Sequence, residues 1–308
     1  MRFLLCFLVA VPLLAQDETK PPQGEPLKYP TGVILVKGAE PSASDTKTPL
    51  PEGGRMANDA YKNDYFGLAY TLPRGLKQPF EGPPPSDTGG YALAQLQPVE
   101  KTKAADATSV LVTAQDLFFS ATPAKSAIDF VANKKDVLPS YYEVERPQEE
   151  VTVAGRKFAR FDYLSRVAGL HWYVLATEVR CHAVQFVFTG RDTKAMETLV
   201  DGLNAMKIGG AAPPCVRDYA AAANVLYRVE PLLTEHRFNR IPVRIVIDTK
   251  GRVKHIHFLS AFPQQATAIT DALLQWRFKP YVVNGEPSEV ETGMVFGGAA
   301  RRTVAAGD

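Results

Sequence analysis

The stretch Ile241-Pro-Val-Arg-Ile-Val-Ile-Asp-Thr-Lys-Gly-Arg-Val-Lys-His-Ile-His-Phe-Leu259 decides the fold of the C-terminal part of the chain. Up to Ile247, branched apolar residues occupy every second position, which is the period of a strand with one buried face. The tetrapeptide Asp248-Thr-Lys-Gly251 predicts a tight turn, in which Gly251 supplies the positive φ that other residues rarely adopt. The return strand is expected at 252–259. The stretch therefore predicts an antiparallel β-hairpin.

The segments on either side of this hairpin complete a small domain at residues 218–297. Residues 220–239 are expected to be mainly helical. After the hairpin, apolar residues at helical spacing predict a second helix at 263–276, with one face toward the core. The turn Asn284-Gly-Glu-Pro287 and a last strand at 289–296 follow. The expected order is helix, strand, strand, helix, strand.

Three motifs of this domain resemble the C-terminal domain of TonB-type proteins. They are the hairpin Ile245-Val-Ile-Asp-Thr-Lys-Gly-Arg-Val253, the helix end Ala272-Leu-Leu-Gln-Trp-Arg-Phe-Lys-Pro280, and the turn Asn284-Gly-Glu-Pro287. They occur in the family's order and span the chain from about residue 229 to residue 296. The residues with structural roles in these motifs are Gly251, Trp276, Phe278, Pro280, Asn284 and Gly285.

The TonB resemblance implies a periplasmic β-β-α-β domain that binds a partner through its edge strand. In that family the edge strand pairs with an extended peptide of an outer-membrane receptor, and main-chain hydrogen bonds give the affinity. By analogy the edge here is the last strand, with Glu289, Glu291, Thr292 and Met294 as the partner-binding residues. We expect a binding module associated with TonB-type transmembrane transport or with an envelope scaffold.

The residues before this domain predict a larger α+β domain at 58–208. Alternating aromatic and apolar segments bounded by Pro and Gly predict an antiparallel sheet. Helices are expected from Thr122, as N-cap with Pro123 at the first helical position, to about Asp136, and from Asp192 to Gly209. A linker is expected at 209–217.

This larger domain loosely resembles PsbP-like domains. The resemblance rests on Tyr65-Phe-Gly-Leu-Ala-Tyr-Thr-Leu-Pro73 and on a terminal helix that follows an aromatic hairpin. The expected fold class is thus α+β: an antiparallel-sheet α/β sandwich domain followed by the small TonB-like domain.

The N-terminus predicts export. Residues 1–15 combine one positive charge with an apolar run that is too short to span a bilayer, so they are expected to be a cleaved signal peptide. The mature protein should be periplasmic or secreted, or membrane-tethered if the signal is retained. Residues 16–57 are rich in Pro and Gly and are expected to be a flexible tether, with a short strand only at 32–37. Residues 298–308 are expected to be a frayed tail.

The charge balance favours a protein or peptide partner over a nucleic acid. The 308 residues carry 35 Lys+Arg against 33 Asp+Glu, whereas a nucleic-acid binder normally shows a clustered excess of base. The apolar fraction of 45% also argues against wholesale disorder.

Two cysteines, Cys181 and Cys215, remain after the signal. In an exported protein such a pair suggests a disulfide, but two buried free thiols are about equally compatible with the strand-like run around Cys181.

The sequence assigns no catalytic residue, no metal and no cofactor. His255 and His257 stand two apart on one strand face, which favours a solvated face over a metal site. Cys181 and His182 are adjacent strand residues and point to opposite faces. Asp116 is interpreted as surface charge. The alternative function is a secreted or periplasmic hydrolase, or a metal-dependent enzyme, built in the first domain.

Overall fold

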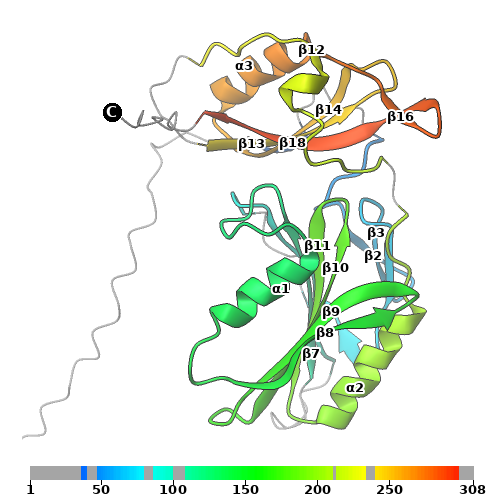
Figure 1. Cartoon of the computed structure of the whole chain (residues 1–308). Helices are drawn as coiled ribbons and strands as arrows, with labels where there is room; N and C mark the ends of the chain where they lie inside the picture. The colour runs from blue at the N-terminus through cyan, green and yellow to red at the C-terminus, as the bar shows by residue number, and fades with distance from the viewer. Residues whose placement is uncertain are drawn as a thin grey trace, which may run out of the picture. The chain divides into compact units, whose positions relative to one another are not determined.

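The computed structural model describes residues 36–39, 47–79, 86–99, 108–210, 213–233 and 240–297 (Figure 1). The signal peptide expected at 1–15 and the tail expected at 298–308 lie outside the described residues. Residues 34–308 form one compact unit, which contains both expected domains. No helix among the described residues is long and apolar enough to cross a membrane.

The first domain is built on a seven-stranded sheet in which every neighbouring pair is antiparallel. Its strands, in spatial order, are β5 (Leu76–Lys77), β6 (Gly90–Pro98), β7 (Ser109–Asp116), β11 (His182–Gly190), β10 (Leu170–Val179), β9 (Arg156–Ser165) and β8 (Glu143–Val153). Strands β9, β10 and β11 are buried on both faces for much of their length, because helices pack on each side of the sheet, whereas β7 is buried only at alternate residues. The expected α+β class is thus observed.

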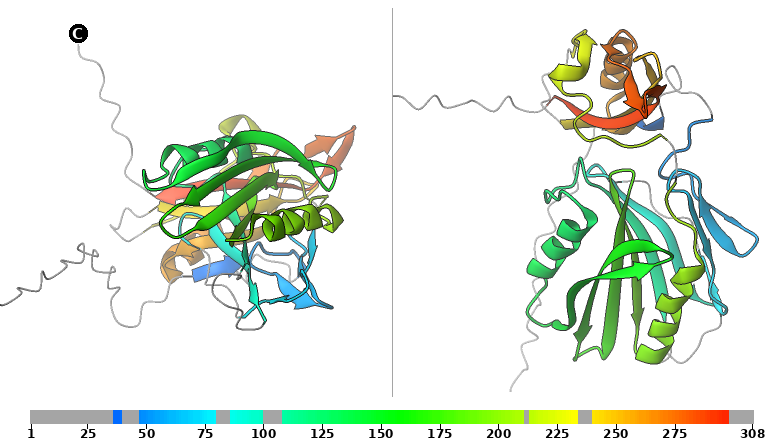
Figure 2. Two further views of the ribbon diagram at one scale, coloured as in Figure 1. Left: turned by 90° about the horizontal axis from the view of Figure 1, so that it is seen from below. Right: turned by 45° about the vertical axis from the view of Figure 1, so that its right-hand side comes forward.

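Two helices cover opposite faces of this sheet (Figures 1 and 2). Helix α1 (Ala127–Asp136) packs on small side chains, and α2 (Thr193–Gly202) packs on a core rich in aromatic rings. The start expected at Thr122 is wrong. Ser126 is the N-cap, because its hydroxyl accepts from the Asp129 N–H at 3.1 Å while the Asp129 carboxylate accepts from the Lys125 N–H. Helix α2 begins after Asp192, as expected, and continues as a 3₁₀ turn, Leu203–Ala205.

A three-stranded sheet, β2 (Arg55–Ala57), β3 (Ala60–Asn63) and β4 (Leu68–Thr71), packs on the α2 side. The expected flexible tether at 16–57 is therefore wrong for its last residues. Pro51 is buried, and its carbonyl accepts from Asn63 Nδ2 at 2.8 Å. The rest of the expected tether, apart from residues 36–39, lies outside the described residues.

The C-terminal domain holds a four-stranded antiparallel sheet with helix α3 (Pro263–Leu273) on one face. Its strands, in spatial order, are β1 (Val36–Ala39), β14 (Val253–Ala261), β13 (Arg240–Ile247) and β18 (Val290–Gly297). Strand β1 comes from the N-terminal part of the chain and adds to the β14 edge. Of the strand expected at 32–37, residues 36 and 37 lie in β1, and residues 32–35 lie outside the described residues.

The helix expected at 220–239 is wrong for the residues that the structure describes. Only Ala222–Asn224 forms a 3₁₀ turn, and β12 (Val225–Tyr227) then pairs with β15 (Arg277–Phe278). The run Val-Leu-Tyr favours extended backbone, and its pairing with β15 overrides the helical spacing.

The two tight turns expected at 248–251 and 284–287 have the backbone that their residues predict. Gly251 has φ +74°, and a Cβ there would lie 2.0 Å from the Phe278 carbonyl oxygen. Asn284 and Gly285, at φ +53° and +87°, join β16 (Tyr281–Val283) to β17 (Glu286–Ser288). Trp276 and Phe278 are buried in the core, whereas Pro280 is exposed.

Candidate functional site

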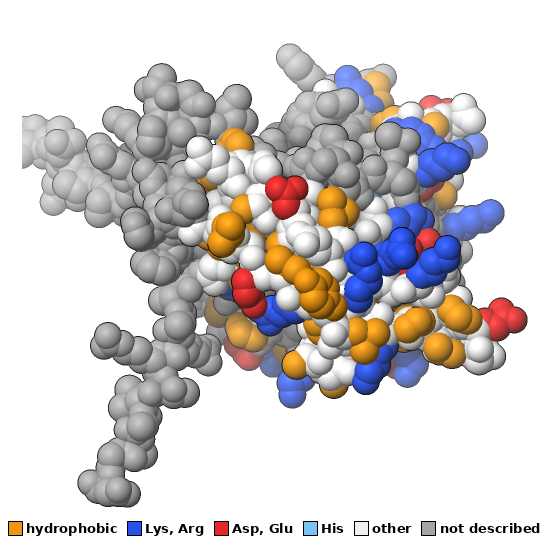
Figure 3. All heavy atoms as spheres, turned by 90° about the horizontal axis from the view of Figure 1, so that it is seen from above, with side chains coloured by type: hydrophobic (Ala, Val, Ile, Leu, Met, Phe, Trp, Pro, Cys, Tyr) orange, Lys and Arg blue, Asp and Glu red, His pale blue; other side chains and the backbone are white. Residues whose placement is uncertain are grey.

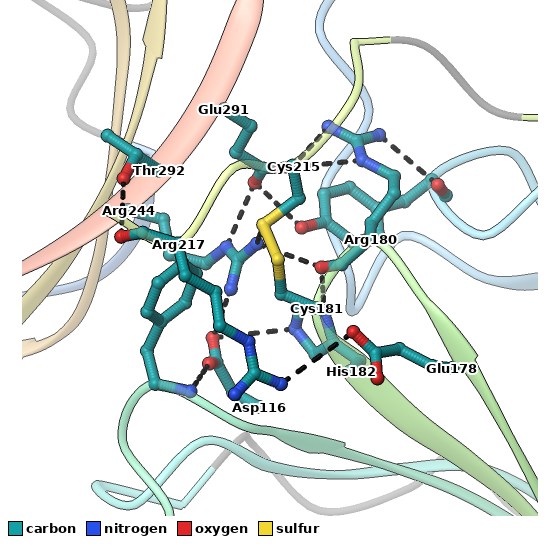
Figure 4. The surroundings of a disulfide bond; sticks show 12 residues. Asp116, Glu178, Arg180, Cys181, His182, Cys215, Arg217, Arg244, Glu291 and Thr292 are labelled. Atoms are coloured by element: carbon teal, nitrogen blue, oxygen red, sulfur yellow. Dashed lines mark hydrogen bonds and ion pairs between the residues drawn. A yellow bond between two sulfur atoms is a disulfide. The ribbon is translucent and has the colours of Figure 1, made fainter. Parts of the chain in front are cut away.

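A buried charge cluster, made of Tyr65, Asp116, Arg180, Arg244 and Glu291, joins the C-terminal sheet to the first domain; Figure 4 labels the last four of these residues. Arg244 lies in β13 and is 1% exposed. Its Nη1 donates to Asp116 Oδ2 at 2.7 Å, and its Nε donates to Glu291 Oε1 at 2.9 Å. One guanidinium therefore bridges a carboxylate of the first domain and a carboxylate of β18.

Glu291 has partners in both domains. Arg180 Nη2 lies 2.7 Å from Glu291 Oε2, and the Tyr65 hydroxyl donates to Oε1 at 2.7 Å. The Arg180 guanidinium also stacks on the Tyr65 ring, 3.8 Å from its centroid. Burial alone would raise the pKa of Glu291, but the charges of Arg244 and Arg180 outweigh it and lower this pKa to about 2. Glu291 is thus ionised at any ordinary pH.

The turn between β10 and β11 brings two parts of the site together. Its residues Arg180 and Cys181 have φ +49° and +57°, which non-glycine residues rarely adopt. The Arg180 carbonyl accepts from Arg244 Nη2 at 3.0 Å, and Cys181 forms a disulfide with Cys215. These bonds fix the strained turn against the C-terminal domain. Of the two alternatives left open for the cysteines, the structure contains the disulfide.

His182 lies below this turn in a fully buried aromatic site. Its Nδ1 lies 2.8 Å from the Arg180 carbonyl, so this nitrogen carries the proton. Its ring meets Tyr65, Phe66 and Tyr91 at centroid distances of 5.5, 5.2 and 5.7 Å. Burial, followed by the charge of Arg244, lowers the pKa of His182 to about 4.

The neutral state of His182 predicts a loss of stability in mild acid. Because its pKa is about 4 in the folded chain and about 6.5 when unfolded, protonation favours the unfolded state. The contribution is present above pH 6.5 and is lost as the pH falls toward 4, by up to about 3 kcal/mol. Urea denaturation at several pH values measures it.

His182→Gln is the control for this prediction, because glutamine keeps a donor for the Arg180 carbonyl and does not titrate. Between pH 6.5 and 4 the free energy of unfolding of this variant should fall less steeply than that of the wild type. Equal slopes would contradict the assignment. Glu291 titrates in a separate window, below about pH 4.5, where its stabilisation is lost as the pH falls toward 2.

Several polar residues that the sequence places on the surface are buried. Asp116 is completely buried and paired with Arg244, so its interpretation as surface charge is wrong. His255 and His257 are each 3% exposed, so the expected solvated face is also wrong. The reason is that the second face of β13 and β14 packs against the first domain instead of facing water. Within the described residues, no group of three His, Cys, Asp or Glu side chains is arranged to hold a metal.

The sequence missed Arg180, Arg244 and Tyr65 as members of the charge cluster. For Arg244 a signal was present: an arginine stands among β-branched residues on both sides, and Val246 shares its strand face. A charge within such a run requires a buried counter-charge. No comparable signal marks Arg180, because it lies in the turn between β10 and β11 and not within an apolar run.

The expected partner-binding strand β18 lies at the edge of the C-terminal sheet, but it is occupied at one point. The Glu291 N–H donates to the Pro214 carbonyl, and its carbonyl accepts from the Val216 N–H, both at 2.9 Å. The Glu291 side chain is in the charge cluster, and the Thr292 hydroxyl donates to the Arg217 carbonyl. The edge expected to be open is therefore covered at Glu291 and Thr292 by the linker.

The other two predicted partner-binding residues differ from these. Met294 is half-buried and packs on the core under α3. Glu289 precedes β18, and its carboxylate accepts from Lys254 Nζ at 2.8 Å. The structure thus does not gather the four side chains on one surface. Three of them lie in β18, and Glu289 directly precedes it.

The outer surface of the C-terminal domain mixes basic and apolar side chains, as Figure 3 shows. Among the described residues of this domain, the large hydrophobic side chains that are exposed are Leu226, Tyr227, Leu232, Leu274, Val282, Val283 and Val295. Val295, 41% exposed, is the one that lies on β18.

Comparison with known proteins finds structural likeness of a low degree. A protein of unknown function from Pseudomonas aeruginosa is 13% identical with a TM-score of 0.29, over 48% of this chain and 92% of that one. The cyanobacterial PsbP of Synechocystis is 15% identical with a TM-score of 0.31, over 59% of this chain and 98% of that one. No family model matches the chain, and no curated protein is similar to it in sequence. TM-scores this low carry no argument about function.

Proposed function

We propose that the protein is an exported, non-catalytic binding protein of the cell envelope. Its C-terminal domain, which resembles TonB-type domains in sequence, binds an extended peptide segment of an envelope or outer-membrane protein by strand addition to β18. This role is associated with TonB-type transport or with an envelope scaffold. The observation that supports this proposal is the backbone pairing of Glu291 with residues 214 and 216. This pairing identifies the β18 residues whose backbone N–H and C=O groups point away from β13.

The direction of the remaining backbone groups follows from that pairing. In a strand, every second residue turns its N–H and C=O to the same side. Because Glu291 turns both groups toward Pro214 and Val216, Gly293 and Val295 turn theirs to the same outer side. Pro242 of β13 is the residue opposite Val295 on β18, and it has no N–H. This agrees with the expectation that Pro242 and Val295 form no hydrogen bond with each other.

The sheet already accepts extended segments of its own chain on both edges. Residues 214–216 bond to β18 at Glu291, and β1 pairs with β14 at the opposite edge. Among the described residues, no backbone bond to the outer side of Gly293 or Val295 is formed. A partner segment that continues the line of residues 214–216 would bond there through its main chain.

The test begins with the full-length mature chain in the envelope of the cells that make it. A benzophenone amino acid at Val295 should cross-link to one envelope protein on irradiation. The same group at Val144, an exposed residue on β8 of the first domain, should not give this product. Absence of a Val295-specific product would contradict the proposal.

A second measurement separates strand addition from side-chain contact. Val295→Pro removes an outward N–H without removing a hydrogen bond of the β13–β18 ladder, and Pro is tolerated where the N–H of an edge strand points away. We expect the affinity for the captured protein to fall about tenfold or more, because a main-chain bond is lost and the ring obstructs pairing. Val295→Thr should bind like the wild type. Equal binding by the folded Val295→Pro chain would overturn the proposal.

A further inference from the structure

A cavity of about 530 Å³ lies on the α1 face of the seven-stranded sheet. Its floor is formed by β7, β9, β10 and β11, and the last turn of α1 and residues 137–139 form one wall. This volume is in the range of sites that hold small organic ligands. It is separate from the charge cluster and from β18, so it carries an inference beyond the proposed function.

The cavity exists because α1 is shorter than the strands it covers. The helix packs on the small side chains of Ala159, Ala176 and Ala183, and it ends at Asp136. Beyond that point the sheet continues with residues such as Leu111 and Val187, which no helix covers. An apolar floor is therefore left open beyond the end of the helix.

One wall of the cavity is an ordered group of aromatic rings. Tyr163 and Trp172 are cross-strand neighbours, and their rings stack with an interplanar angle of 7° and centroids 5.3 Å apart. Tyr142 meets both rings edge-on, at 5.4 and 5.2 Å. Because the three rings hold one another, the wall is formed before any ligand binds.

A single cationic side chain lines the cavity. Lys134, in the last turn of α1, forms no ion pair with a described residue, and its Nζ lies 5.2 Å from the centroid of the Phe130 ring. The next residue, Lys135, belongs to the same helical turn but does not line the cavity. Lys134 is exposed as a whole side chain, but partial desolvation of its amine lowers its pKa. An anion beside it would restore the favourable surroundings of the charged amine.

We propose that this cavity binds a small organic carboxylate with an apolar body. The carboxylate pairs with the Lys134 ammonium, and the body lies on the apolar floor against Trp172 and Tyr142. Ser109 and Thr189, which also line the cavity, offer hydroxyl groups to a second polar atom of the ligand. Hydrophobic and aromatic walls with a few polar groups are the usual composition of such sites.

The experiment titrates the full-length mature chain with three probes by calorimetry and by tryptophan emission. Dodecanoate has a chain as its apolar body, adamantane-1-carboxylate has a compact cage, and adamantane-1-carboxamide is the neutral counterpart of the second. The chain has two tryptophans, and the other, Trp276, is buried in the C-terminal domain. A change in emission that disappears in Trp172→Phe therefore reports on the cavity.

We expect adamantane-1-carboxylate to bind about tenfold more tightly than adamantane-1-carboxamide, because a hydrogen bond to a charged group is stronger than one between neutral groups. Lys134→Met should remove this advantage and leave amide binding unchanged, whereas Lys135→Met, the matched control, should bind like the wild type. Val187→Phe, which fills the floor, should abolish binding of all probes. Whether dodecanoate or the cage binds more tightly identifies the body that the cavity accepts.

Three results would overturn the proposal. The first is an amide that binds as tightly as its carboxylate, and the second is an equal loss of affinity in Lys134→Met and Lys135→Met. The third is the absence of both binding heat and a Trp172-dependent change in emission for both carboxylates. Each variant is exposed or half-buried at the changed position, and circular dichroism checks that it is folded.

Discussion

Arg244→Met is expected to destabilise the protein by about 3–5 kcal/mol, which is the cost of removing one partner from a buried ion pair. Methionine has a volume close to that of arginine, so packing changes little. The variant leaves Asp116 without its cation, while Glu291 keeps Arg180. Urea denaturation at pH 7 measures the loss.

Two further variants test whether the charge of Arg244 and the geometry of its hydrogen bonds cause this loss of stability. Arg240→Met removes the same charge from an exposed position on the same strand and should cost less than about 0.5 kcal/mol. Arg244→Lys should also be destabilising, because a single ammonium cannot donate along the separate directions of Asp116 and Glu291. A loss of under 1 kcal/mol for Arg244→Met would mean that the cluster is not desolvated.

The same variant links the cluster to the titration of His182. The charge of Arg244 helps to lower the pKa of His182, whose Nε2 lies 3.5 Å from Asp116 Oδ2. In Arg244→Met this pKa should rise, because the neighbouring carboxylate is then uncompensated. Titration of the imidazole followed by NMR would show the shift.

Removal of the disulfide is expected to cost about 3–4 kcal/mol, because the bond closes a loop of 34 residues in the unfolded chain. The double variant Cys181→Ser/Cys215→Ser and the reduced wild type should show the same loss in urea denaturation. Mass mapping without reductant should recover the two cysteine peptides as one species. Separate peptides would show that the thiols are free.

The disulfide also has a consequence for β18. Cys215 lies between Pro214 and Val216, the two residues that bond to Glu291, so the bond holds the linker against the strand edge. In the double variant, amide exchange at Val216 should become faster than in the wild type, while exchange at Val243 in the centre of the sheet changes less. Equal protection at Val216 would show that the linker holds its place without the disulfide.

The sequence predicted local structure well where the signal is short-range. The hairpin at Asp248–Gly251, the turn at Asn284–Gly285 and helix α2 follow from turn chemistry, capping and period, which depend on neighbours in the chain. It failed for residues 225–227, where pairing with β15 decided the backbone, and for residues 47–57, where burial against β3 did.

The candidate site, too, could be predicted only in part. From the sequence alone, the last strand could be placed at a sheet edge and the two cysteines recognised as a possible pair. That Glu291 is buried, that Asp116 and Arg244 pair, and that the linker covers part of the edge could not be predicted. These contacts join residues from 47 to 226 positions apart, with no periodic pattern between them.

By itself, then, the sequence determined the α+β class and the secondary-structure elements that have clear turn residues, caps or periodicity. Only the tertiary structure decided which face of β13 is dry, which charges meet, and where α1 ends above an open apolar floor. The physical reason is that period and turn preference act between neighbours in the chain. Desolvation of a charge such as Arg244 instead depends on every segment that packs around it.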